Sequence, residues 1–147
     1  MDSCVTAASA ISDGYKTAFL HINYGQRTES REVTAFNKIA NHYKVNEKLI
    51  VDISHLAKIG GSCLTDENLD VPEADLENDE IPISYVPFRN ANILAIATSW
   101  AEVLEAKAIY VGAVEDDSSG YPDCRRSFFD AFEYTIETGT KSNTKIK

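Results

Sequence analysis

Three segments of the chain carry side chains that could bind an anion. Ser3 follows Asp2 at the expected start of a helix, where a hydroxyl, backbone N–H groups and the helix dipole all favour a phosphate oxygen. Arg89 precedes another expected helix, and its guanidinium can bind a phosphate or a carboxylate through two hydrogen bonds. A loop at residues 116–125 combines several carboxylates with Arg125. The ordinary alternatives are a helix cap for Ser3 and a surface ion pair for Arg89.

Hydrophobic periodicity predicts the elements that must position these groups. Apolar residues at helical spacing predict helices, and short apolar runs predict buried parallel strands. The expected helices are residues 3–12, 29–43, 90–104 and 126–137. The expected strands are residues 17–22, 48–52 and 108–112, and a fourth could begin within 144–147. The expected buried stripes include Val5, Ala8 and Ile11 in the first helix, and Ile93, Ile96, Ala97, Trp100, Val103 and Leu104 in the third.

Helices and strands alternate along the chain. This alternation is typical of an α/β fold with a doubly wound parallel sheet and helices on both of its faces. The chain opens on a helix, so we expect that the first strand of such a sheet is missing. Ligands bind these sheets at the carboxyl ends of strands. Residues 116–125 follow the strand that ends at Gly112, so this loop is expected to lie at a binding site.

Length and composition predict a single soluble, cytoplasmic domain over residues 1–147. The net charge of −9 disfavours a basic surface for a nucleic-acid backbone. No apolar run approaches the length of a membrane span, and Met1 opens no signal peptide. The three cysteines form no C-x-x-C pair, so we expect no disulfide framework and no metal site. Residues 64–82 are an expected acidic insertion, since eight acidic residues and no Lys or Arg lie between positions 65 and 81.

Five motifs together resemble those of one enzyme family. Met1-Asp2-Ser3 looks like the end of S-G-G-x-D-S, the pyrophosphate-binding loop of the N-type ATP pyrophosphatases. The later motifs are NYGQR at 23–27, IGGS at 59–62, IPISYVPFRN at 81–90 and SGYPDCR at 119–125. In this order they make essentially the whole chain similar to the 7-cyano-7-deazaguanine synthases, which have a Rossmann-like fold of the adenine nucleotide alpha-hydrolase type. The Ser-Gly-Gly half of the loop and the family's C-terminal cluster of four cysteines are absent, so we expect a chain truncated at both ends.

The resemblance implies an ATP-dependent ligase of queuosine biosynthesis. It would convert 7-carboxy-7-deazaguanine and ammonia to 7-cyano-7-deazaguanine. Transfer of AMP from ATP would make a mixed anhydride, ammonia would give an amide, and a second activation with dehydration would give the nitrile. The implied cofactors are ATP and Mg²⁺, with zinc only in the full-length family through its cysteine cluster. The implied partners are small molecules, with no direct nucleic acid or membrane, and a second copy in a homodimer.

The resemblance also assigns roles to individual residues. Asp2 would hold Mg²⁺ or orient the loop, and Ser3 would bind phosphate. The nucleotide-contact candidates are Tyr24, Gln26 and Arg27, for which a turn that caps the next helix is an equal alternative. The substrate-contact candidates are Arg89, Asn90, Asp117, Tyr121, Asp123 and Arg125, of which Arg89, Asp117 and Asp123 are the catalytic candidates. A helix cap is the alternative for Asn90, and a packed aromatic residue is the alternative for Tyr121. One carboxylate, of Asp117 or of Asp123, could accept both adjacent N–H donors of a guanine-like ring, and the sequence does not rank the two.

Two other functions stay open. A PP-loop enzyme that adenylates another substrate, such as a tRNA-modifying thiolase, would share the fold, but it would more naturally carry a basic tRNA-binding face. A nucleotide-binding module without turnover is the second alternative, because the phosphate loop is incomplete. Cys124 is expected to be structural rather than nucleophilic, since no His lies near it in the sequence.

Overall fold

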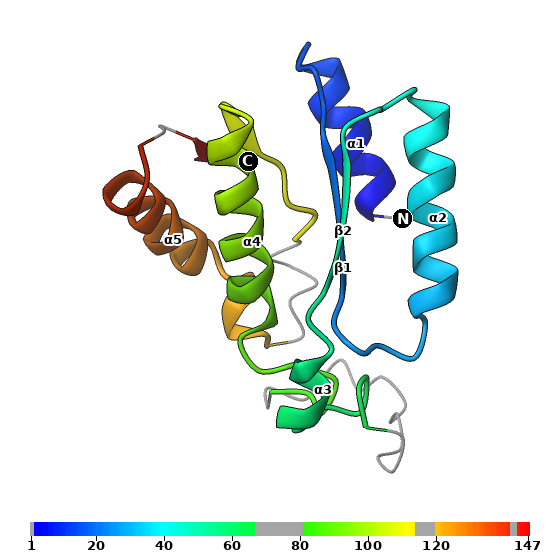
Figure 1. The fold of residues 1–147 in the computed structure, drawn as a ribbon. Helices are drawn as coiled ribbons and strands as arrows, with labels where there is room; N and C mark the ends of the chain where they lie inside the picture. Colours follow the sequence, from blue (N-terminus) through cyan, green and yellow to red (C-terminus); the bar gives the residue numbers. More distant parts are fainter. Residues whose placement is uncertain (1, 67–80, 114–119, 142–143) are drawn as a thin grey trace. The chain divides into compact units, whose positions relative to one another are not determined.

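The computed structural model describes residues 2–66, 81–113, 120–141 and 144–147, and its elements are drawn in Figure 1. The chain divides into two compact units, which are described one at a time. The first unit comprises Met1–Thr6, Leu76–Pro82 and Phe88–Lys147, and the second comprises Ala7–Asp75 and Ile83–Pro87. Helix α1 (Asp2–Ser12) belongs to the first unit by its first turn and to the second by the remainder.

A strand–helix–strand motif forms the centre of the second unit. Strands β1 (Phe19–Asn23) and β2 (Lys48–Asp52) pair in parallel, with Phe19 opposite Lys48 and Asn23 opposite Asp52. Helix α2 (Glu29–His42) connects them and packs against β1, with Ala40 fully buried. The ring of Phe36 lies 6.4 Å from that of Phe19 and 5.4 Å from that of His21. The short helix α3 (His55–Ile59) follows β2 and was not expected from the sequence.

The first unit holds the remaining elements, which include a second parallel pair. Helix α4 (Arg89–Val103) precedes β3 (Ala108–Ile109). The 3₁₀ turn η1 (Pro122–Cys124), helix α5 (Arg126–Gly139) and strand β4 (Lys145–Ile146) follow. Strands β3 and β4 are parallel, with Ala108 opposite Lys145. Helix α5 packs through its phenylalanines and through Ile136, which is 1% exposed.

The expected elements are present, with boundaries that differ by at most two residues. The strand expected over residues 108–112 is the exception, because pairing covers only its first two residues. The alternation of helices with parallel strands confirms the α/β class. The single doubly wound sheet and the single domain stay predictions. Within the described residues no helix combines the length and the hydropathy that a membrane crossing requires.

Two of the expected buried stripes are wrong. On α1, Val5 is 60% exposed, and the buried residues are Ala7 and Ala10. On α4, Val103 and Leu104 are exposed, and the buried residues are Ala91, Leu94 and Ala101. Both helices are rich in alanine and apolar around most of their circumference, so their periodicity does not single out one face.

Candidate functional site

Three expected site residues meet at the first turn of α4 in the first unit. The buried carboxylate of Asp123 accepts a hydrogen bond from the backbone N–H of Asn90, with Oδ2 at 2.9 Å from the nitrogen. The side-chain amide of Asn90 donates to the backbone carbonyl of Asp123 at 2.9 Å and to the sulfur of Cys124 at 3.3 Å. The η1 turn is therefore fastened to the start of α4 by three hydrogen bonds, although 33 residues separate Asn90 from Asp123.

Arg89 belongs to the same cluster. It is the first residue of α4, directly before Asn90, and its side chain is half-buried. Burial raises the pKa of the Cys124 thiol, and the negative charge of Asp123 adds to this increase. The hydrogen bond from Asn90 and the positive charge of Arg89 act in the opposite direction on this pKa. The Arg89 guanidinium thus lies within electrostatic range of Cys124, and a raised thiol pKa favours the expected structural role of this cysteine.

The residue before Arg89 has an unusual backbone conformation. Phe88 adopts φ = +57°, in the left-handed region that bulky residues rarely occupy. Its carbonyl accepts hydrogen bonds from the backbone N–H and the side-chain amide of Asn92, and its ring packs edge-on against that of Phe128 at 6.4 Å. These contacts hold the chain reversal that starts α4 at Arg89.

The start of α1 packs against the segment that follows β3, inside the first unit. A Cβ atom added to Gly112 would lie 2.7 Å from Thr6 Oγ1 and 3.3 Å from Asp2 Cβ. Thr6 Oγ1 donates to the carbonyl of Asp2 at 2.8 Å, and the side chains of Asp2 and Ser3 are exposed. Gly112 therefore permits a close approach of the expected phosphate-binding turn. No sequence signal pointed to this role of Gly112.

Two further expected residues of the first unit flank the η1 turn. Tyr121 is half-buried, and Arg125 is exposed at the start of α5. Arg126 pairs with Asp130 at 2.8 Å on the exposed surface. Asp117 lies outside the described residues, so of these two carboxylates the structure describes only Asp123.

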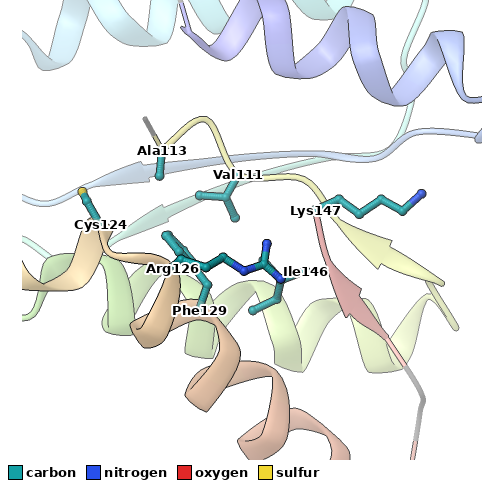
Figure 2. A pocket seen from close by; sticks show the side chains of 7 residues that line it. All are labelled: Val111, Ala113, Cys124, Arg126, Phe129, Ile146 and Lys147. Atoms are coloured by element: carbon teal, nitrogen blue, oxygen red, sulfur yellow. The ribbon is translucent and has the colours of Figure 1, made fainter. Parts of the chain in front are cut away.

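A pocket of about 210 Å³ opens beside this cluster in the first unit. In Figure 2 the segment with Val111 and Ala113 lies across from the η1–α5 segment, and the end of β4 closes one side. Its lining residues are Val111, Ala113, Cys124, Arg126, Phe129, Ile146 and Lys147. The walls combine apolar side chains with two cations, which are already engaged, Arg126 with Asp130 and Lys147 with the ring of Tyr110 at 5.6 Å.

The expected nucleotide contacts lie at the end of β1 in the second unit. Gln26 is 5% exposed, and its side-chain oxygen accepts from the N–H of Tyr24 at 2.9 Å. Its amide nitrogen donates to a carboxylate oxygen of Glu32 at 2.9 Å. Arg27 donates from Nη2 to the carbonyl of Asp66 at 2.5 Å. These contacts describe a turn fastened to α2, and the nucleotide roles of these residues stay predictions.

A hydrogen-bonded chain beside this turn was missed from the sequence. His21 Nε2 lies 2.8 Å from the side-chain oxygen of Asn23, whose amide nitrogen donates to Glu29 Oε1 at 3.0 Å. Both partners of Asn23 could have been suspected, because His21 alternates with it along the strand and Glu29 opens the next helix. Across the described segments, no three His, Cys, Asp or Glu side chains gather closely enough to hold a metal ion.

The chain matches known proteins over its whole length. The family model for the queuosine biosynthesis protein QueC matches residues 1–147. The chain is 56% identical over 147 residues to the 7-cyano-7-deazaguanine synthases of Chlorobium phaeobacteroides (strain BS1) and Chloroherpeton thalassium. It is 53% identical over 147 residues to that of Chlorobium chlorochromatii.

These alignments cover 100% of this chain but 65%, 65% and 64% of the three relatives. The chain therefore spans slightly less than two thirds of their length. The family expected from the five motifs is confirmed by the full-length family match and by these identities. The chain belongs to the QueC family of queuosine biosynthesis proteins.

Proposed function

We propose that this chain carries nucleotide- and substrate-binding parts of an ATP-dependent ligase that makes 7-cyano-7-deazaguanine from 7-carboxy-7-deazaguanine and ammonia. The observation that carries the proposal is the family match over all 147 residues, together with relatives named for this synthesis. The gathering of Arg89, Asn90 and Asp123 at one helix end supports it from the structure.

The chemistry requires activation of an unreactive carboxylate. A carboxylate oxygen attacks the α-phosphorus of ATP and releases pyrophosphate, which leaves an acyl adenylate. Ammonia attacks the acyl carbon, and AMP leaves with formation of the amide. The amide oxygen attacks a second ATP, pyrophosphate leaves again, and loss of AMP and protons gives the nitrile. These steps need positioned charges around the phosphates more than a protein nucleophile, which agrees with a structural Cys124.

We propose these roles for the chain's own residues. The exposed end of α1 carries Asp2 and Ser3, of which Ser3 donates to a phosphate. Asp2 suits Mg²⁺, which proteins commonly bind through one or two carboxylates together with substrate phosphates. Tyr24, Gln26 and Arg27 shape the nucleotide side of the site. Arg89, Asn90, Asp117, Tyr121, Asp123 and Arg125 form the substrate side.

The finer architecture and the cellular setting belong to the same proposal. The parallel pairs are proposed to be parts of one doubly wound sheet within a single domain, because each pair has a helix as its crossover connection. The enzyme is proposed to act as a cytoplasmic homodimer on a free base rather than on tRNA. The acidic net charge of −9 supports the free base.

The test uses an extended protein, made by adding to this chain the segments of the Chlorobium phaeobacteroides (strain BS1) relative that lie outside the aligned region. It is incubated with 7-carboxy-7-deazaguanine, ammonia and Mg-ATP, and the nitrile is followed by mass spectrometry. We expect product that depends on all three. Arg89→Ala should lower the rate at least about tenfold, a loss of about 1.4 kcal/mol in transition-state binding.

The matched control is Arg126→Ala, because Arg126 is a neighbouring arginine whose guanidinium pairs with Asp130 on the exposed surface. ATP consumption without nitrile would favour a PP-loop enzyme with another substrate. Nucleotide binding without consumption of ATP would favour a binding module.

A further inference from the structure

We propose that Asp123 is a positioning residue, which fastens the η1 turn to the start of α4 and thereby places Arg89 against an anionic group of the ligand. The proposal rests on the proposed function for the identity of that group, which is either the carboxylate of the base or a phosphate of the nucleotide. It gives Asp123 a role other than recognition of the base, for which Asp117 is the other candidate.

The first argument is burial. Asp123 is only 3% exposed, although an ionised carboxylate is costly to bury without partners. Its Oδ2 is satisfied by the backbone N–H of Asn90, in the first turn of α4. The first backbone N–H groups of a helix have no partner inside the helix, and the helix dipole favours a negative charge at this end. The environment of Asp123 is therefore that of a capping carboxylate.

The second argument is the reciprocal contact from Asn90. Its side-chain amide returns to the carbonyl of Asp123 and to the sulfur of Cys124, so the two segments are joined from both sides. Arg89 is the next residue towards the N-terminus, and its charge acts on Cys124. Arg89 is the first residue of α4, so its backbone position depends on where this start of the helix is held.

The third argument concerns the acceptor geometry that base recognition requires. Two adjacent N–H donors of a guanine-like ring need both oxygens of one carboxylate. In Asp123 one oxygen already accepts from Asn90 and the side chain is buried. Because Asp123 is 3% exposed and already engaged by Asn90, it is suited to hold the two segments together rather than to receive a ring.

The experiment measures the affinity of this chain and of the extended protein for two probes, 7-carboxy-7-deazaguanine and inorganic pyrophosphate, by isothermal titration calorimetry. Arg89→Ala identifies the probe that Arg89 binds. For that probe we expect Asp123→Ala to weaken binding at least about tenfold. Asp123→Asn keeps an oxygen that can accept from the N–H of Asn90, so it should restore the affinity to within about threefold of the unsubstituted protein.

Two controls separate positioning from a loss of stability. Ile136→Val removes a buried methyl group from α5 and should lower the thermal midpoint without a change in affinity. Asp130→Asn changes an exposed carboxylate of the same unit and should leave the affinity unchanged. All titrations are made well below the midpoint of the least stable variant.

Three results would overturn the proposal. One is a loss in Asp123→Asn as large as in Asp123→Ala, which is expected if both carboxylate oxygens contact the ring. The second is unchanged affinity in Asp123→Ala. The third is no Arg89-dependent binding of either probe. Absence of nitrile in the turnover assay would instead remove the proposed function, and the binding pattern of the variants would still decide the role of Asp123.

Discussion

Replacement of Gly112 by alanine should loosen the contact between α1 and the segment after β3. The new Cβ atom would lie 2.7 Å from Thr6 Oγ1, 3.3 Å from Asp2 Cβ and 3.4 Å from the carbonyl carbon of Asp2. Rotation of the Thr6 side chain would relieve the shortest contact, but it would break the hydrogen bond of 2.8 Å to the Asp2 carbonyl. The two contacts with Asp2 would persist, so the first turn of α1 must move.

The cost follows from these contacts. Overpacking of this kind destabilises proteins by about 1–3 kcal/mol. The φ angle of Gly112 lies outside the left-handed region, so alanine adopts this backbone without strain. Alanine also lowers the conformational entropy of the unfolded chain, which by itself would stabilise the fold by about 0.4–1 kcal/mol. We therefore expect a net loss of about 1.3 kcal/mol in the free energy of unfolding, and of at most about 2.6 kcal/mol. Because Asp2 and Ser3 move with the turn, the extended protein should also bind Mg-ATP more weakly.

The assay is urea unfolding of the chain, followed by circular dichroism. Gly139→Ala is the matched control, since no atom lies within 4 Å of its added Cβ in the last turn of α5. It should stabilise the chain by about 0.5–1 kcal/mol. Thr6→Ala in the Gly112→Ala background should recover at least about 0.5 kcal/mol, because the two substitutions share one contact. An unfolding midpoint of Gly112→Ala equal to that of Gly139→Ala would refute the steric reasoning.

Two further predictions concern titrating groups. The backbone N–H of Ile146 and the ammonium of Lys145 lower the pKa of Glu133 from its ordinary value of 4.5. Ionised Glu133 therefore stabilises the fold above pH 4.5, and this stabilisation is lost as the pH falls through the folded-state pKa. When the pH is lowered from neutral to below 4.5, the free energy of unfolding should fall less in Glu133→Gln than in the unsubstituted chain. Equal losses in urea unfolding would contradict this. Burial raises the pKa of the Cys124 thiol, so iodoacetamide at pH 8 should alkylate it several-fold more slowly than the exposed Cys4, measured by peptide mass spectrometry. Equal rates at the two cysteines would argue against the packing described around Asn90.

Local pattern predicted most of the secondary structure. Residues 48–52 form the strand expected there, and α2 begins at the expected residue and ends one residue before the expected end. In these segments the apolar residues follow a single period, so the local sequence is sufficient to predict the type of element. In α4 several faces are apolar, and the buried side depends on which neighbours pack against the helix.

The sequence by itself determined the family and the α/β class, because these depend on residue types and on their order and spacing along the chain. What Asp123 contacts was decided only by tertiary structure, since its partner Asn90 lies 33 positions away and the unpaired N–H groups at the start of α4 attract a buried carboxylate. The same holds for Gly112, whose missing side chain matters only because Thr6 and Asp2 pack against it. Long-range approach is set by packing and not by sequence spacing, so the sequence named candidate site residues while the fold assigned their contacts.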